Sequence, residues 1–331
     1  MTFRFARLVG TLACAFGLTG LSGLATAQTA EMSVGHVLAT ASHYHAAAAK
    51  FSEVVNQKSK GAIKATVFPG GQLGGEVKML QSARTGTLDV VVTGEAPLEG
   101  FAKEFAVFSF PYLFSSVDQI NGVLQGPIGR GMLDLLPKYN LVGLGFISAL
   151  ERNIFTNGKV VNTVADMKGL KIRVIQGPGY VKAYQALGAQ PTPMAYTELY
   201  TALQNGAVDA AENSPDVFLQ DRFIEVSKTY ANLKIMYMPA VIVMSKAKYD
   251  ALSPEMQKVV QEATAEAIAF ATAQYKKDYA DAFAAMKKTG VKIVEPDLKP
   301  FMEVGRSVHG DLLGEFPMAK PWYEKIVAAT K

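Results

Sequence analysis

Hydrophobic residues in the first third of the chain alternate between two spacings. In some segments apolar and polar residues alternate one by one, as in strands, and in others apolar residues recur at intervals of three and four, as in helices. Strands connected by helices form right-handed crossovers and a parallel sheet. This pattern predicts an α/β fold. The expected elements are a strand at 31–36, a helix at 42–58, a strand at 63–68, a helix at 75–85 and a strand at 88–92.

The same alternation restarts after a segment at 117–139 that is predicted to be helical. A chain of roughly 300 residues exceeds the usual size of a single hydrophobic core, so the pattern predicts two lobes joined by a hinge, with a cleft between them. Ligands of such sheets bind where strands end and helices begin. The further expected elements are strands at 142–148, 154–156, 171–175, 210–212 and 240–244 and helices at 180–187 and 198–205.

One predicted helix is unusually long. No helix breaker occurs for 36 residues from Pro254 to Thr289, Ser253 is a suitable N-cap and Gly290 suits the position after the last turn. A straight helix of that length extends roughly 54 Å, so we expect it to span both lobes. The expected organisation is lobe I at 28–150, completed by about 239–253, the long helix at 254–289, and lobe II at 151–238, completed by about 279–331.

The first 27 residues have the pattern of a cleavable export signal. Arg4 and Arg7 precede an uncharged apolar stretch, and Ala25-Thr26-Ala27 has the small residues of a cleavage site. A membrane anchor is the alternative, because the apolar stretch is almost long enough to span a bilayer. The single cysteine, Cys14, lies inside this segment. We expect a periplasmic protein whose mature form contains no cysteine, and therefore no disulfide, thiol nucleophile or thiolate metal site.

The charge balance of the mature chain gives no indication of nucleic-acid binding. Removal of the two arginines of the leader leaves 31 basic and 29 acidic residues, and charges of both signs are interspersed. No hydrolase, metalloprotease or phosphate-loop motif is present. The glycine-rich run 70–75 lacks the spacing of a dinucleotide-binding loop. A secreted enzyme acting on an organic acid is the remaining, less favoured, alternative of another class.

Two arginines twenty-one residues apart are the main candidates for ligand binding. Arg173 lies in an alternating strand pattern and Arg152 precedes another strand. A guanidinium is permanently charged and matches a carboxylate with two parallel hydrogen bonds, so an arginine at the end of a buried strand suits an organic anion. Surface ion pairs are the alternative for both residues. Together with Asn213, which ends another predicted strand, both arginines fall where a cleft between the lobes is expected.

Several short motifs are distributed over nearly the whole mature chain. The most specific is Asp166-Met167-Lys168-Gly169-Leu170-Lys171-Ile172-Arg173-Val174. The others are Gly70-Gly71-Gln72-Leu73-Gly74, Gly86-Thr87-Leu88-Asp89, Phe110-Pro111-Tyr112-Leu113-Phe114, Pro191-Thr192-Pro193-Met194-Ala195-Tyr196 and the run from Gln204 to Asn213. With these motifs in this order, the chain resembles the periplasmic solute receptors of TRAP transporters, of the DctP type, in which the long helix is also a family trait.

The resemblance implies a receptor that closes around an organic anion and delivers it to a permease with a small and a large membrane subunit. It implies that Arg173 clamps the ligand carboxylate, that Arg152 is a second contact and that Asn213 binds the same carboxylate. Glu95 is a candidate for accepting ligand hydroxyls, with capping or pairing to Lys103 as the alternative. Further candidates, each with a structural role as its alternative, are Gln72, His36 and Tyr196.

The ligand that we expect is a sugar acid, either a uronate or an aldonate. A four-carbon dicarboxylate and an aromatic or branched oxo-acid are the alternatives, because Arg152 suits a second carboxylate as well as a hydroxyl or carbonyl oxygen. His43 and His45 do not predict a metal site, since no third ligand is evident. We expect no cofactor, no metal and no catalytic residue, and we expect the receptor to be a monomer.

Overall fold

The computed structural model of the protein describes residues 30–330, so the predicted leader at 1–27 lies outside the described residues. Within this range a single mixed sheet of nine strands runs through the molecule, in the order β2-β1-β3-β8-β4-β7-β5-β6, with β9 beside β8. The strands are β1 (Ala30–Gly35), β2 (Ile63–Phe68), β3 (Val90–Gly94), β4 (Leu141–Thr156), β5 (Lys171–Val174), β6 (Gln190–Pro193), β7 (Ala210–Asn213), β8 (Thr229–Ser245) and β9 (Lys292–Val294).

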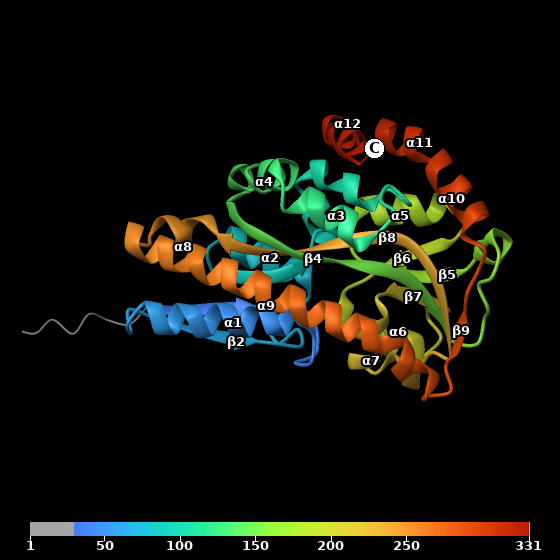
Figure 1. The fold of residues 1–331 in the computed structure, drawn as a ribbon, viewed down its shortest axis with the longest axis horizontal. Helices are drawn as coiled ribbons and strands as arrows, with labels where there is room; N and C mark the ends of the chain where they lie inside the picture. The colour runs from blue at the N-terminus through green and yellow to red at the C-terminus, as the bar shows by residue number, and fades with distance from the viewer. Residues whose placement is uncertain (1–29, 331) are drawn as a thin grey trace, which may run out of the picture.

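Helices cover this sheet, and together they form the two-lobed α/β fold (Figure 1). The α-helices are α1 (His43–Lys58), α2 (Glu76–Arg84), α3 (Val117–Leu124), α4 (Pro127–Leu133), α5 (Pro178–Ala186), α6 (Tyr196–Gln204), α7 (Pro215–Gln220), α8 (Lys246–Asp250), α9 (Pro254–Lys287), α10 (Leu298–Ser307), α11 (His309–Glu315) and α12 (Lys320–Ala329). Short 3-10 helices are η1 (Ala96–Gly100), η2 (Lys103–Ser109), η3 (Leu136–Tyr139), η4 (Val164–Met167), η5 (Phe223–Glu225) and η6 (Pro317–Ala319).

The strand–helix alternation predicted for lobe I is present. Strand β1 pairs in parallel with β2 on one side and with β3 on the other, and α1 and α2 are the connecting helices. In lobe II, β5 pairs in parallel with both β6 and β7. The limits of the two lobes along the chain stay a prediction.

Two long strands connect the lobes. Strand β4 has 16 residues and β8 has 17, and the two pair antiparallel along almost their whole length. The strands expected at 142–148 and 154–156 are therefore parts of one continuous strand, and the strand expected at 240–244 is the last part of a strand that begins at Thr229. The polar residues Glu151, Arg152 and Asn153 interrupt the apolar pattern, but they are buried within the continuous strand. Register shifts between Phe146 and Ala149 and between Arg152 and Ile154 bend β4 between the lobes.

The long helix α9 is confirmed and ends at Lys287, two residues before the predicted end. The hydroxyl of Ser253 accepts a hydrogen bond from the Met256 amide, and Gly290 follows with a left-handed φ of 78°. Figure 1 shows α9 running the length of the molecule, beside α1 at one end and α7 at the other. It therefore contacts both lobes.

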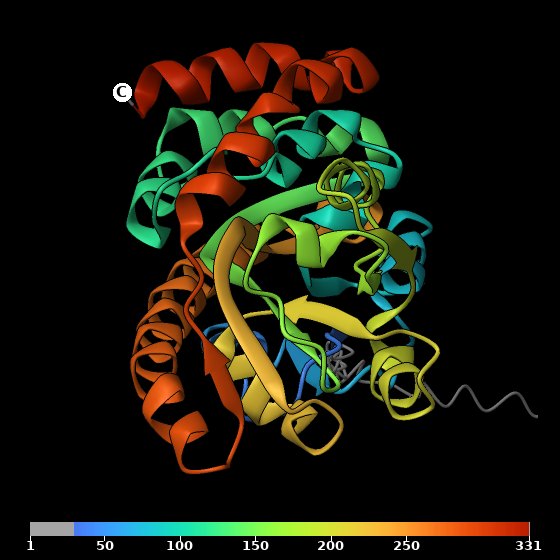
Figure 2. The same ribbon diagram turned by 90° about the vertical axis from the view of Figure 1, so that its right-hand side faces the viewer.

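The helix expected at 117–139 is broken into α3, α4 and η3, a correction with a local cause. Gly126 and Pro127 start a new helix, and Pro137 lies in η3. The C-terminal helices form an outer layer over this region (Figure 2), where α12 contacts α4 and α11 contacts α5. No helix between residues 30 and 330 is both long enough and apolar enough to cross a membrane.

Candidate functional site

A small cavity lies between the lobes, close to the bend of β4. It measures about 10 Å³, roughly the space of one water molecule. This is far below the roughly 300–1,000 Å³ of typical ligand pockets. Its lining includes four predicted site residues and residues from both lobes: Val37, Leu38, Tyr44, Glu76, Leu150, Arg152, Arg173, Ile175, Tyr196, Asn213 and Met238.

Arg173 lies on β5 and is almost completely buried. Its Nε and Nη2 donate to the Met194 carbonyl at 3.2 and 2.9 Å, whereas Nη1 has no partner among the described residues. Burial lowers the pKa of Arg173, although the carboxylates of Glu212 and Glu76 act in the opposite direction. An arginine remains protonated under these conditions, so Nη1 is a buried, charged and unpartnered donor on a residue that lines the cavity.

Arg152 lies on β4 and is committed to a partner that the sequence analysis did not identify. Its Nε donates to the Glu212 carboxylate, its Nη2 donates to the Glu212 carbonyl at 2.9 Å, and its Nη1 donates to Asn213 Oδ1 at 2.7 Å. Burial acts to lower the pKa of Arg152, but the Glu212 carboxylate outweighs it and raises the pKa. Arg152 therefore enters the cavity as part of a buried ion pair.

Asn213 and Tyr196 complete the lobe II wall. Asn213 Oδ1 also accepts a hydrogen bond from the Ser214 backbone amide at 2.9 Å. The remaining polar group of the Asn213 side chain is its amide nitrogen, Nδ2. The ring of Tyr196 lies beside Arg173, with 5.6 Å between the guanidinium carbon and the ring centroid. Its hydroxyl donates to Asp221 Oδ2 at 2.5 Å. Burial, and then Asp221, raise the pKa of Tyr196 well above its ordinary value.

The lobe I wall contains a second residue that the sequence analysis missed. Glu76 is buried at the start of α2, and its Oε1 accepts from Thr93 Oγ1 at 2.9 Å and from the Gly94 amide at 3.1 Å. Burial raises its pKa, although these hydrogen bonds and both arginines oppose the shift. The residue follows the 70–75 glycine run directly, so the first acidic side chain after that run was the available signal.

Three predicted site residues do not line the cavity. Glu95 is fully buried at the end of β3, neither carboxylate oxygen has a partner among the described residues, and burial raises its pKa well above the usual range. His36 is buried and contacts His45 through its Nε2 at 3.1 Å; burial and then His45 lower its pKa to about 3. Gln72 is exposed in the turn before α2.

The lobes are in direct contact around the cavity. Gly71 of lobe I lies against the Thr197 side chain of lobe II, and a Cβ on Gly177 would lie 2.9 Å from both the Cβ and the carbonyl oxygen of Ala96. With the arginines buried and the cavity this small, an organic acid can enter only if the lobes separate. The contacts therefore describe a closed arrangement of the two lobes.

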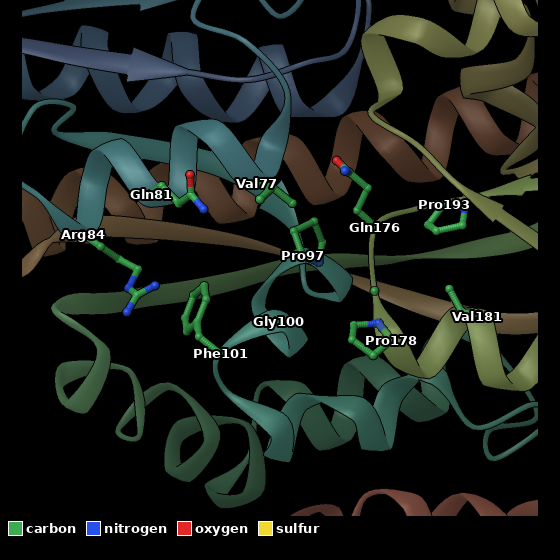
Figure 3. Close-up of a pocket in the computed structure, with 11 residues that line it drawn as sticks. Val77, Gln81, Arg84, Pro97, Gly100, Phe101, Gln176, Pro178, Val181 and Pro193 are labelled. Atoms are coloured by element: carbon green, nitrogen blue, oxygen red, sulfur yellow. The ribbon is translucent and has the colours of Figure 1, made fainter.

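A larger groove lies on the outside of this closed junction. It measures about 400 Å³, with one wall from lobe I, including Arg84, Pro97 and Phe101, and the other from lobe II, including Gln176 and Pro178. Figure 3 shows these walls facing each other, with the Arg84 guanidinium near the Phe101 ring, 4.4 Å from its centroid. Because both lobes form it, the groove has this shape only when the lobes are closed.

The described residues offer no metal centre. Between residues 30 and 330 no group of three or more His, Cys, Asp or Glu side chains is placed to hold a metal ion. The chemistry of the inner cavity is that of an anion site with one free arginine donor, a paired arginine, an amide and an opposing carboxylate.

Comparisons with known proteins identify relatives over most of the chain. The model of the DctP family, described as bacterial extracellular solute-binding protein, family 7, matches residues 34–314. The 2,3-diketo-L-gulonate-binding periplasmic protein YiaO of Escherichia coli K12 is 29% identical over 304 residues, which cover 91% of this chain and 93% of YiaO.

Solved structures agree with this match. The sugar acid binding protein DctPAm from Advenella mimigardefordensis, in complex with galactonate, has a TM-score of 0.87 and 30% identity, covering 91% of this chain and 98% of that protein. A TRAP periplasmic solute binding protein from Polaromonas sp. JS666, bound to D-erythronate, has a TM-score of 0.86 and 30% identity, covering 90% of this chain and 98% of that protein. These relatives are substrate-binding receptors, not enzymes. The chain belongs to family 7 of the bacterial extracellular solute-binding proteins, the periplasmic receptors of TRAP transporters.

Proposed function

We propose that this receptor captures a hydroxylated monocarboxylate, a uronate or an aldonate, by closing its lobes around it. The observation that carries the proposal is the unpartnered Nη1 of Arg173, buried in a cavity whose opposite wall is the Glu76 carboxylate. A cationic donor on one wall and a carboxylate acceptor on the other match a ligand that is anionic at one end and bears hydroxyl donors at the other.

The ligand carboxylate sits against the Nη1–Nη2 edge of Arg173. Nη2 has two hydrogens, and only one is required by the Met194 carbonyl, so two parallel hydrogen bonds remain available. The Asn213 side-chain amide nitrogen, Nδ2, supplies a third donor to the same carboxylate. Tyr196 packs beside the arginine and limits where the carboxylate lies.

Arg152 suits a hydroxyl or carbonyl oxygen better than a second carboxylate. Its charge is already balanced by Glu212, and Glu76 faces the same space. A dicarboxylate would place its second negative charge near these two acids in a buried site, where like charges interact strongly. The charge arrangement thus favours a monoanion over the four-carbon dicarboxylates.

Contacts from lobe I provide the selection for hydroxyl groups. Glu76 lines the cavity, and Glu95 is the second proposed acceptor, since neither of its oxygens has a partner among the described residues. Burial raises the pKa of both carboxyl groups, but a carboxyl group accepts hydrogen bonds through both oxygens when ionised and through its carbonyl oxygen when protonated, so both residues suit hydroxyl donors. His36 is a proposed neighbour of the ligand, and Gln72 a proposed contact at the rim. Because the donors for the carboxylate are on lobe II, a ligand that bridges both sets of groups stabilises the closed state.

The relative from Advenella mimigardefordensis is in complex with galactonate, and the one from Polaromonas is bound to D-erythronate. YiaO is named as a 2,3-diketo-L-gulonate-binding protein. All three ligands are hydroxylated carboxylates, which supports the same class for this chain. The predicted leader exports the receptor to the periplasm. There it acts as a monomer that delivers its ligand to the small and large membrane subunits of its permease.

A thermal-shift and calorimetric screen of the protein from residue 28 onward tests the proposal. Galactonate and glucuronate should raise the melting temperature and bind without being converted, whereas succinate, a branched oxo-acid and neutral galactose should bind at least tenfold more weakly. If succinate alone stabilised the protein, the ligand class would be the dicarboxylates and the proposed sugar acids would be excluded. Conversion of a bound acid would overturn the receptor assignment.

The variant Glu76→Gln tests the hydroxyl-selecting wall. Loss of an acceptor that takes a hydrogen bond from a ligand hydroxyl removes about 1.5–3 kcal/mol, or roughly a tenfold to hundredfold loss of affinity for galactonate. Glu53→Gln, an exposed carboxylate on α1, is the matched control and should leave the affinity unchanged. Equal affinities for Glu76→Gln and wild type would exclude Glu76 as a ligand contact.

A further inference from the structure

Asp221 lies between the two lobes and contacts each of them through a different oxygen. It follows α7 directly, in lobe II, and its own amide donates to the Val217 carbonyl at 3.0 Å. Oδ1 accepts from the Ala39 amide at 2.9 Å, a contact between residues 182 positions apart. Oδ2 accepts from the Tyr196 hydroxyl at 2.5 Å. A single carboxylate thus joins a lobe I backbone amide to a lobe II tyrosine.

The Ala39 amide belongs to the loop that forms part of the cavity wall. This loop connects β1 to α1, and Val37 and Leu38 line the cavity. The loop is held in lobe I, because the Ser42 hydroxyl donates to the Ala39 carbonyl at 2.7 Å and the Gly70 amide donates to the Leu38 carbonyl at 3.1 Å. The bond to Asp221 is therefore lost when the lobes separate, whereas the bonds that hold the loop inside lobe I are not.

Tyr196 connects Asp221 to the carboxylate clamp. Its ring lies beside the Arg173 guanidinium, and the Met194 carbonyl, two residues earlier, accepts two hydrogen bonds from the same guanidinium. Fixing the Tyr196 hydroxyl therefore fixes the ring that borders the clamp. Asp221 itself does not line the cavity.

We propose that Asp221 is a positioning residue that couples lobe closure to the carboxylate clamp, holding Tyr196 beside Arg173 while it locks the Ala39 amide of the opposite lobe. The inference rests on the proposed capture of a ligand by closure. The bond to Ala39 exists only in the closed state, so it slows ligand release and leaves the rate of ligand association unchanged. The bond to Tyr196 lies within lobe II and sets the geometry of the site in both states.

The chain contains a matched control for this contact. Tyr200 and Glu225 form the same kind of pair, with 2.7 Å between the hydroxyl and the carboxylate and the same sequence separation of 25 residues. Both residues belong to lobe II, and the pair is exposed and does not reach lobe I. Glu225→Ala therefore removes a tyrosine–carboxylate bond without removing a contact across the cleft.

Dissociation rates of galactonate and glucuronate, measured by stopped-flow displacement at pH 7.5, test the proposal. At this pH Asp221 is ionised, because the pKa of about 6 to which burial raises it still lies below 7.5. We expect Asp221→Ala to release ligand at least tenfold faster, equivalent to about 1.4 kcal/mol, with association within twofold of wild type. Asp221→Asn keeps an acceptor for the Ala39 amide and a polar partner for Tyr196, so it should restore release to within about threefold of wild type.

Three outcomes separate the possible failures. Equal release rates for Asp221→Ala and Glu225→Ala in a protein that binds these acids would overturn the positioning role and leave the proposed function intact. A wild-type protein that binds neither acid would overturn the proposed ligand class. If neither acid binds, hydrogen exchange of the Ala39 amide tests the role of Asp221 without a ligand. The proposal requires this amide to exchange faster in Asp221→Ala than in Asp221→Asn, and equal exchange rates would overturn the positioning role. If Asp221→Ala fails to fold, Tyr196→Phe, which removes only the hydroxyl, replaces it in the measurement of the release rate.

Discussion

Replacing Arg173 by methionine removes the carboxylate clamp while keeping most of the side-chain volume. The guanidinium is buried on β5, with Nε and Nη2 held by the Met194 carbonyl and Nη1 without a partner among the described residues. Methionine cannot donate to either the carbonyl or a ligand. The substitution therefore tests whether the free edge of Arg173 binds the ligand carboxylate.

The expected magnitude follows from the two hydrogen bonds that the Nη1–Nη2 edge of Arg173 is proposed to donate to the ligand carboxylate. Each charge-assisted hydrogen bond contributes about 1.5–3 kcal/mol, so two contribute about 3–6 kcal/mol. At about 1.4 kcal/mol for each tenfold change, galactonate should bind about 10²–10⁴-fold more weakly. The ligand-free protein should lose little stability, because removing a buried charge offsets the loss of the hydrogen bonds to the Met194 carbonyl. Its melting temperature should stay within about 4 °C of wild type.

Titration calorimetry at pH 7.5 measures the affinity, and differential scanning calorimetry measures the melting temperature. Lys171→Met, an exposed position on the same strand, is the control and should leave both quantities unchanged. An Arg173→Met affinity within tenfold of wild type would refute the clamp. A melting temperature lowered by much more than 4 °C would show that Arg173 is required for the fold, so that its effect on binding is indirect.

Two further predictions concern closure and pH. Gly177→Ala should weaken galactonate binding by about tenfold without lowering the melting temperature, because the added Cβ would meet Ala96 across the closed junction. Gly100→Ala is the control, since a Cβ there has open space around it, and it should change neither the affinity nor the melting temperature. Equal calorimetric affinities for the two variants would contradict the closed geometry. His36 should make folding sensitive to acid: burial and then His45 lower its pKa to about 3 from the ordinary 6.5, so its stabilising contribution is present above pH 6.5 and is lost as the pH falls below it. Between pH 7.5 and 5 the free energy of unfolding, measured with denaturant, should fall by about 2 kcal/mol more for the wild-type protein than for His36→Gln. An equal fall in both proteins would assign the acid sensitivity to other groups.

Sequence reasoning found the arginines of the site but missed their acidic partners. Arg152 and Arg173 stand out because strand patterns rarely contain buried arginines. Glu212 lies inside the recognised run from Gln204 to Asn213, and Glu76 directly follows the glycine-rich run 70–75. Nothing in the local pattern shows that these two carboxylates are buried, since acidic residues at strand ends and helix starts are usually exposed.

The strand errors have a related cause. The run from Glu151 to Asn153 is polar, and a polar run usually ends a strand. Here these residues continue β4 because β8 pairs with them along the other side and buries them between the lobes. Strand continuity was therefore decided by a partner far away in sequence.

By itself, the sequence determined the α/β lobes, the long helix α9 and the positions of two cationic side chains. These properties follow from residue spacing, helix breakers and caps, which act over a few neighbouring residues. The tertiary structure decided which donors remain free. Arg152 is neutralised by Glu212, 60 residues later, whereas Arg173 keeps Nη1 unpartnered. It also decided that Asp221 reaches Ala39, 182 residues earlier. Such pairings depend on how the lobes meet, because a buried charge takes whichever partner the packing brings within hydrogen-bond distance.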